Sequence, residues 1–172
     1  WLTQFIPPAM ERSTFVLAAA ATLALLFWQW RPLPQAVWTV NDPVGYGALL
    51  GLSMLGWAMV FASSFMVSHA DLFGLRQSFL GFVGRLYEPL PFKVIGLYRL
   101  VRHPLMLGFL VAIWFTPTMT AGHLYFAALV TAYIFVGTRF EERDLVAHFG
   151  EQYREYRRRV PSILPIPRRS QS

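Results

Sequence analysis

Three long stretches without charge constrain this chain more than any other feature of its sequence. Residues 13–30, 44–68 and 104–138 contain no Asp, Glu, Lys or Arg, so all 15 basic and 9 acidic side chains lie elsewhere. A soluble domain keeps charges on the outer face of each helix, whereas a bilayer core needs about 20 apolar residues per crossing. The pattern therefore predicts an integral membrane protein and excludes a soluble globule.

The amino-acid composition excludes several other classes of protein. The chain has no cysteine, which excludes a disulfide-stapled domain and a cysteine-ligated metal site. Its 15 Phe, 7 Tyr and 6 Trp exclude a disordered chain. The net charge of +6 is typical of basic residues that flank membrane spans and contact anionic lipid, so we expect membrane lipid and no nucleic acid as a partner.

The uncharged stretches predict how the chain crosses the membrane. The third stretch is too long for one span, and Thr116–Gly122 in its middle has the Pro and Gly content of a turn, so it predicts a helical hairpin. The predicted membrane helices cover about 13–30, 44–68, 97–115 and 122–142. Leu145, Phe149, Tyr153, Tyr156 and Val160 then follow at helical spacing and predict an amphipathic helix over about 143–160.

The expected fold is all-α, a single-domain multi-pass integral membrane helical bundle with a cytoplasmic C-terminal amphipathic helix. Its orientation follows from the hairpin, which returns to its starting side and leaves segments 69–103 and 139–172 in one compartment. These segments hold 13 of the 15 Lys and Arg residues, and the positive-inside rule makes their side cytoplasmic.

Three polar clusters are expected to meet at that side. They are Tyr98–Pro104 with Gly108, Arg139–Asp144, and Tyr153–Tyr156 with Val160-Pro161. Antiparallel arms place Arg102-His103 and Glu141-Glu142 at the same end of the hairpin. From composition alone this convergence fits an interfacial salt-bridge cluster as well as an active site.

The order of these clusters resembles a known superfamily of membrane methyltransferases. The chain resembles isoprenylcysteine carboxyl methyltransferase and phospholipid N-methyltransferase in three successive motifs. They are Arg102-His103-Pro104 with Gly108, then Glu141-Glu142 with Leu145, then Gly150, Tyr153, Tyr156 and Val160-Pro161. Asp71–Gln77 and Thr116–His123 are similar to the bacterial methanethiol S-methyltransferase family within it. Members of that family have further N-terminal helices, so we expect such helices ahead of Trp1, where the chain begins without Met.

The resemblance implies methyl transfer from S-adenosylmethionine to a small thiol, methanethiol, at the cytoplasmic face of a bacterial inner membrane. His103 and Pro104 would border the cofactor, a Glu of the acidic pair would accept hydrogen bonds from it, and Arg102 or Arg154 would pair with its carboxylate. The residues expected to hold the cofactor are Tyr98, Arg102, His103, Pro104, Gly108, Glu141, Glu142, Tyr153, Arg154 and Tyr156.

Catalysis on a thiol requires removal of its proton, because the thiolate is the species that attacks. His103 is a candidate proton acceptor, with placement of the cofactor as its alternative role. Arg99 and Arg102 could stabilise an anion, and His69 with Asp71 forms a second candidate pair. We expect no metal at the site.

Two other readings remain open from the sequence. One is a methyltransferase of the same architecture that acts on a prenylcysteine carboxylate or a phospholipid amine. The other is a non-enzymatic membrane subunit whose charges only set its topology. The sequence indicates no oligomeric state.

Overall fold

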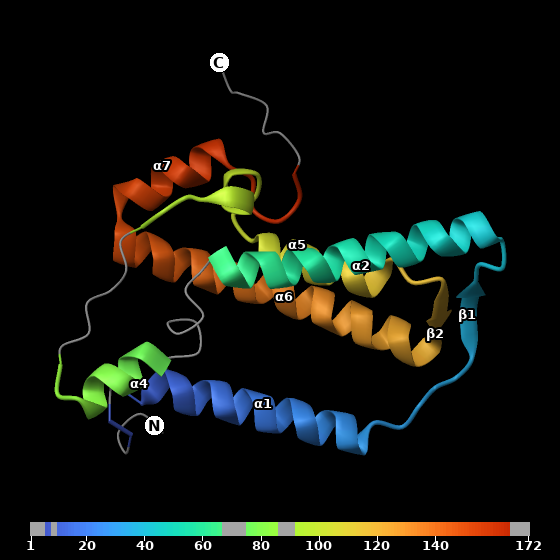
Figure 1. The fold of residues 1–172 in the computed structure, drawn as a ribbon, viewed down its shortest axis with the longest axis horizontal. Coiled ribbons are helices and arrows are strands. Elements are labelled where there is room, and N and C mark those ends of the chain that lie inside the picture. The colour runs from blue at the N-terminus through green and yellow to red at the C-terminus, as the bar shows by residue number, and fades with distance from the viewer. Residues whose placement is uncertain (1–5, 8–9, 67–74, 86–91, 166–172) are drawn as a thin grey trace. The chain divides into compact units, whose positions relative to one another are not determined.

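The computed structural model describes residues 6–7, 10–66, 75–85 and 92–165, which are mostly helical (Figure 1). The chain divides into two compact units, and each is described by itself. The first unit holds Trp1–Pro32 and Val67–Pro91, and the second holds Leu33–Met66 and Phe92–Ser172.

The first unit contains α1 (Glu11–Gln29) and α4 (Leu75–Phe82). Helix α1 matches the first predicted span to within two residues at each end. It ends where Trp30 takes extended backbone ahead of Arg31-Pro32, because proline cannot continue a helix. The hydroxyls of Ser13 and Ser78 lie 2.9 Å apart and join the two helices.

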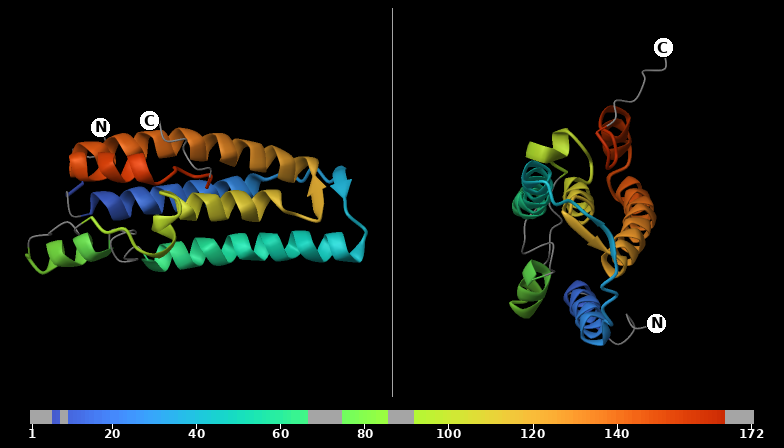
Figure 2. Two further views of the ribbon diagram at one scale, coloured as in Figure 1. Left: turned by 90° about the horizontal axis from the view of Figure 1, so that it is seen from above. Right: turned by 90° about the vertical axis from the view of Figure 1, so that its right-hand side faces the viewer.

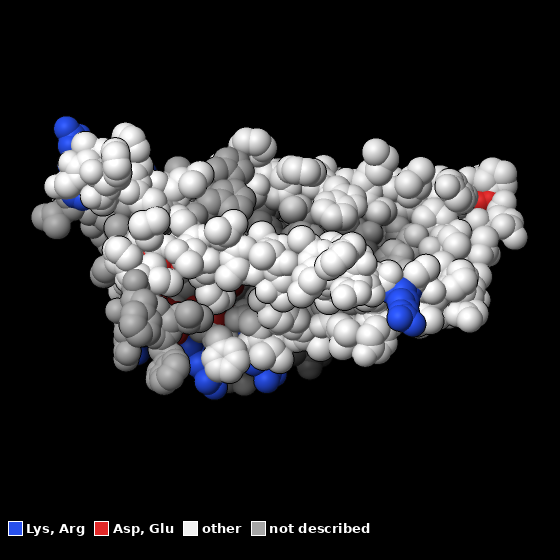
Figure 3. Space-filling model, turned by 90° about the horizontal axis from the view of Figure 1, so that it is seen from below, with Lys and Arg blue, Asp and Glu red and all other residues white. Residues whose placement is uncertain are grey.

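The first helix of the second unit is α2 (Pro43–Met66), and the residues at its start favour a helix there. The Asp42 carboxylate accepts a hydrogen bond from the Gly45 N–H at 2.7 Å, and Pro43 occupies the first helical position, where a missing N–H is harmless. By length and composition, α2 and α6 (Ala121–Phe149) could each cross a membrane. Most of the described side chains visible in Figure 3 are uncharged.

Helix α5 (Pro104–Trp114) lies between α2 and α6, and the axes of the three helices are nearly aligned (Figure 2). Two glycines allow α2 and α5 to touch. A Cβ added to Gly56 would lie 2.5 Å from the Ala112 nitrogen, and one added to Gly108 would lie 2.8 Å from the Gly56 oxygen. The backbones are therefore in direct contact, as small residues permit in membrane helices.

A short pair of strands closes the end of the hairpin, although the sequence pattern predicts no strands. Strand β1 (Ala36–Thr39) pairs antiparallel with β2 (Thr118–Thr120), with Ala36 opposite Thr120 and Thr39 opposite Thr118. The loop ahead of α2 is thus tied to the predicted turn. The indole N–H of Trp114 donates to Thr131 at 2.9 Å and links the arms of the hairpin.

The C-terminal part differs from the single helix predicted over 143–160. Helix α6 continues to Phe149, and α7 (Glu151–Arg159) starts in a new direction after Gly150. Gly150 has φ +59°, a left-handed conformation that only glycine adopts at little cost. The turn brings α7 back beside η2 (Gly96–Arg99), a 3₁₀ turn.

Candidate functional site

The segment before α5 is irregular, and this exposes its main chain for bonding. A helix is predicted from residue 97, but the regular helix starts only at Pro104, because proline disfavours helical backbone in the preceding residue. His103 accordingly has φ −124° and ψ 64°. Its N–H donates to the Ser162 carbonyl at 3.0 Å, and the Arg102 N–H donates to the carbonyls of Pro161 and Ser162, both at 2.9 Å.

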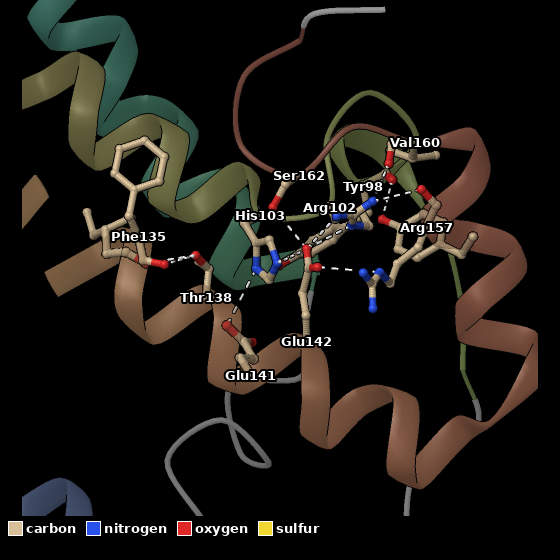
Figure 4. Close-up of polar contacts among 12 residues, drawn as sticks. Tyr98, Arg102, His103, Phe135, Thr138, Glu141, Glu142, Arg157, Val160 and Ser162 are labelled. Carbon is tan, nitrogen blue, oxygen red and sulfur yellow. Dashed lines mark hydrogen bonds and ion pairs between the residues drawn. The ribbon is translucent and has the colours of Figure 1, made fainter. Parts of the chain in front are cut away.

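The Glu142 carboxylate is the centre of the polar cluster (Figure 4). Its Oε1 accepts hydrogen bonds from Arg102 Nε at 3.0 Å and Arg102 Nη2 at 2.5 Å. The Ser162 hydroxyl donates to the same oxygen at 2.9 Å, and His103 Nε2 lies 3.2 Å from it. The other oxygen, Oε2, lies 3.5 Å from Arg157 Nε. One carboxylate therefore joins α6, the start of α5 and the C-terminal segment.

Arg102 is held on its other side by main-chain oxygens. Its Nη1 donates to the carbonyl of Arg157 at 3.0 Å and to that of Val160 at 2.6 Å. The side chain is 1 % exposed. We call residues 157–162 the C-terminal clasp, because they close over the guanidinium and leave its donors engaged by protein groups.

His103 lies between the two acidic side chains of α6. Its side chain is 5 % exposed, with Nε2 near Glu142 and Nδ1 3.5 Å from Glu141 Oε2. Burial alone would lower the pKa of His103, but hydrogen bonds to Glu141 and Glu142 and their charges outweigh burial and raise it to about 9. The imidazole is therefore protonated at neutral pH.

The two neighbouring glutamates have different surroundings, because adjacent helical residues point about 100° apart. The Glu142 side chain is 12 % exposed, whereas that of Glu141 is 51 % exposed. One turn before Glu142 on the same face, Thr138 is buried and donates to the Ile134 carbonyl at 2.8 Å. Glu141 consequently keeps acceptor positions open to solvent, whereas those of Glu142 are largely filled.

The tyrosines of α7 anchor that helix to the rest of the cluster. The Tyr156 hydroxyl donates to the Tyr98 carbonyl at 2.6 Å. The Tyr153 and Tyr156 rings pack edge-on against Phe92, at 5.8 Å and 5.3 Å between centroids. Burial raises the pKa of Tyr156 to about 12, and burial with the Glu141 charge raises that of Tyr98 to about 12, so both phenols stay neutral.

The structure brings together only some of the residues singled out from the sequence. Arg102, His103, Glu141 and Glu142 form the cluster, Tyr98 and Tyr156 adjoin it, and Pro104 begins the next helix. Away from it, Gly108 contacts α2, Arg99 is exposed, Arg154 pairs with Glu151 at 3.3 Å on an exposed face, and Tyr153 lies in the aromatic contact. His69 and Asp71 lie outside the described residues.

Three members of the cluster carry no sequence signal for this role. They are Ser162, the Arg157 side chain and the Val160 carbonyl. A main-chain carbonyl can be supplied by any residue type, and only the Val160-Pro161 pair of the motif pointed to this segment. Among the residues that the structure describes, no group of three or more His, Asp or Glu side chains could hold a metal ion.

Comparison with known proteins identifies relatives of the whole chain. Methanethiol S-methyltransferase of Mycobacterium tuberculosis is 55 % identical over 169 residues, which are 98 % of this chain and 69 % of that protein. Methanethiol S-methyltransferase 2 of Bradyrhizobium diazoefficiens is 53 % identical over 165 residues, 96 % of this chain and 63 % of the relative. Nurim of Bos taurus is 28 % identical over 154 residues, 84 % of this chain and 58 % of that protein.

The chain thus spans about two thirds of the length of these curated relatives. No family model matches the chain, and no solved structure matches it.

Proposed function

The chain belongs to the methanethiol S-methyltransferase family, and we propose on this premise that it transfers a methyl group from S-adenosylmethionine to methanethiol to form dimethyl sulfide. The observation that carries the proposal is the 55 % identity to a named methanethiol S-methyltransferase across 98 % of this chain. The geometry supports it, since Arg102-His103, Glu141-Glu142 and residues 157–162 meet at Glu142 although they are distant in sequence.

The exposed part of the cluster suits S-adenosylmethionine. This cofactor presents ribose hydroxyls and an ammonium group as donors, and an ionised carboxylate with free lone pairs accepts from both. Glu141 has such lone pairs, because half of its side chain is exposed and its contact with His103 Nδ1 is long, at 3.5 Å. We assign the cofactor contact to Glu141 and a supporting role to Glu142.

The two candidate arginines for the methionine carboxylate differ in their burial and in their hydrogen-bond partners. Arg102 is buried, and its guanidinium donates to Glu142 and to two carbonyls. Arg154 is 55 % exposed and has only a surface pairing with Glu151, which contributes about 0–1 kcal/mol. Arg102 therefore holds the C-terminal clasp, and of the two arginines Arg154 is the one whose guanidinium is open to a carboxylate.

When bound, S-adenosylmethionine supplies a methyl group activated by a sulfonium. The methanethiolate sulfur forms a bond to the methyl carbon as the sulfonium–methyl bond breaks, and that electron pair stays on the donor sulfur. The thiol proton is released to solvent. Because His103 is protonated at neutral pH, we do not assign to it the role of proton acceptor. Its role is instead electrostatic, since its positive charge stabilises the thiolate.

We place the cluster at the cytoplasmic face of the membrane. Helices α2 and α6 are long and apolar enough to cross, and most Lys and Arg residues lie in the segments at the cluster's end of the hairpin. Helix α7, with Arg157, Arg158 and Arg159 in its last turn, then lies on the cytoplasmic side near anionic lipid.

The direct test is product formation by purified protein in detergent micelles. With S-adenosylmethionine and methanethiol, headspace gas chromatography should detect dimethyl sulfide, and Glu141→Gln should reduce the rate at limiting cofactor. The control reactions contain a prenylcysteine or phosphatidylethanolamine in place of the thiol. Methylation of either lipid without dimethyl sulfide formation would contradict the proposed acceptor, and no S-adenosylmethionine binding would contradict the enzyme assignment.

A further inference from the structure

Ser63 of α2 is completely buried, at 0 % exposure, and its hydroxyl has no hydrogen-bond partner. Among the residues that the structure describes, it is the one buried side-chain polar atom in this condition. A hydroxyl shielded from water loses its solvent hydrogen bonds, so a partner missing from the protein is the normal explanation of such a group.

Other helical hydroxyls show how such a group is usually satisfied in this chain. Thr131 donates to the carbonyl of Ala127 at 2.6 Å and Thr138 to that of Ile134 at 2.8 Å, in each case four residues earlier. The adjacent Ser64 donates to the Phe61 carbonyl at 3.2 Å. Ser63 makes no such bond within its own helix, so its hydroxyl stays available for another group.

The register of α2 against α5 places Ser63 at the level of the candidate site. Ser53 donates to the Ala112 carbonyl at 2.8 Å, and a Cβ on Gly108 would lie 2.9 Å from the Val60 nitrogen. The helices are therefore antiparallel, and α2 advances toward the start of α5. Ser63 lies one turn beyond Val60 on the same face, which is level with Pro104, the neighbour of His103.

We propose that the Ser63 hydroxyl donates a hydrogen bond to the acceptor sulfur and so positions the thiolate between α2 and the start of α5. This inference rests on the proposed function. It assigns a substrate contact to α2, which lies outside the methyltransferase motif of residues 102–161. The bound species is a small thiol in its anionic form. A hydroxyl donor stabilises that anion while the sulfur attacks the methyl carbon and the sulfonium–methyl bond breaks.

The size of the acceptor fits this place. Gly56 and Gly108 hold the two backbones in direct contact within two turns of Ser63, so a bulky group at this level would have to push the helices apart. Methanethiol has two heavy atoms, whereas a prenyl or acyl chain would have to separate the helices. The uncharged surroundings on α2 also strengthen a hydrogen bond to an anion, because little water competes for it.

The test compares Ser63→Ala with Ser64→Ala in purified protein. Ser64 is the matched control, since it is the neighbouring serine with a hydroxyl already bonded inside the helix. Ser63→Ala should lower kcat/KM for methanethiol by about 10-fold or more, the scale of a hydrogen bond to a charged group. The Kd for S-adenosylmethionine should stay within twofold of wild type, and the Tm should be unchanged or higher, because removal of an unsatisfied hydroxyl costs the fold nothing.

Several results would overturn the inference. An unchanged kcat/KM in Ser63→Ala would show that the hydroxyl faces a buried water or nothing. A fall in Tm together with loss of cofactor binding would assign Ser63 a structural role, and an equal loss in Ser64→Ala would do the same. If wild-type protein forms no dimethyl sulfide, the proposed function itself fails, which is distinguishable from an active wild type with a fully active Ser63→Ala.

Discussion

Neutralising each glutamate of the acidic pair should have opposite effects on stability and on cofactor binding. Glu142→Gln removes the anion that faces the Arg102 guanidinium, 1 % exposed, and the His103 imidazolium, 5 % exposed. Loss of one partner of a buried ion pair costs about 3–5 kcal/mol. Since about 1 kcal/mol shifts the Tm of a chain of this length by about 2–4 °C, we expect a fall of roughly 10 °C.

Glu141→Gln should cost less stability than Glu142→Gln, because the Glu141 side chain is 51 % exposed and its contact with His103 Nδ1, at 3.5 Å, is longer than the contacts of Glu142. It should instead weaken S-adenosylmethionine binding by about 1.5–3 kcal/mol, the scale of a hydrogen bond to a charged group.

Tryptophan fluorescence during heating in detergent measures the Tm of both variants. Calorimetric titration below the lower Tm measures their cofactor affinity. A Glu142→Gln variant that melts with wild type, or a Glu141→Gln variant that binds S-adenosylmethionine as wild type does, would refute the division of roles.

Two further predictions follow from the same contacts. The pKa of His103 is raised to about 9, so its protonation stabilises the fold fully below about pH 6.5 and less as pH rises through 9. Wild type should therefore lose up to about 3 kcal/mol of stability between pH 6.5 and 10, and this loss should be absent from His103→Gln. Equal urea unfolding midpoints of wild type at the two pH values would contradict this. Gly108→Ala should destabilise the α2–α5 contact by about 1–3 kcal/mol, because its Cβ would lie 2.8 Å from the Gly56 oxygen. Gly137→Ala, where a Cβ would meet nothing within 4 Å, should be neutral or stabilising by up to about 1 kcal/mol, and equal Tm values for the two variants would count against the close approach.

The sequence alone determined where most of the chain is helical. Uncharged stretches of membrane length predict α1, α2 and the α5–α6 hairpin, because hydropathy and proline act locally, within a few residues. The predicted hairpin also required Arg102-His103 and Glu141-Glu142 to lie close together. Arg102-His103 lie near the start of its first arm and Glu141-Glu142 lie at the end of its second arm, and in an antiparallel pair these ends are adjacent. The contacts of His103 with both glutamates agree with that expectation.

Local signals were weaker where the chain changes direction. The spacing of apolar residues over 143–160 predicts one helix, but Gly150 turns the chain by a left-handed φ that periodicity does not reveal. The strands β1 and β2 were likewise not expected, because a pair of three or four residues is stabilised by the partner segment rather than by its own pattern.

Only the tertiary structure decided which groups surround each polar residue. Arg102 and Arg154 look equally suited to a carboxylate in the sequence, yet one is enclosed by the carbonyls of Arg157 and Val160 and the other is exposed. Glu141 and Glu142 are chemically identical neighbours that differ by about 100° of rotation about the α6 axis. Main-chain acceptors and the packing around a side chain carry no residue-type signal, so burial and hydrogen-bond partners become known only when distant segments are brought together.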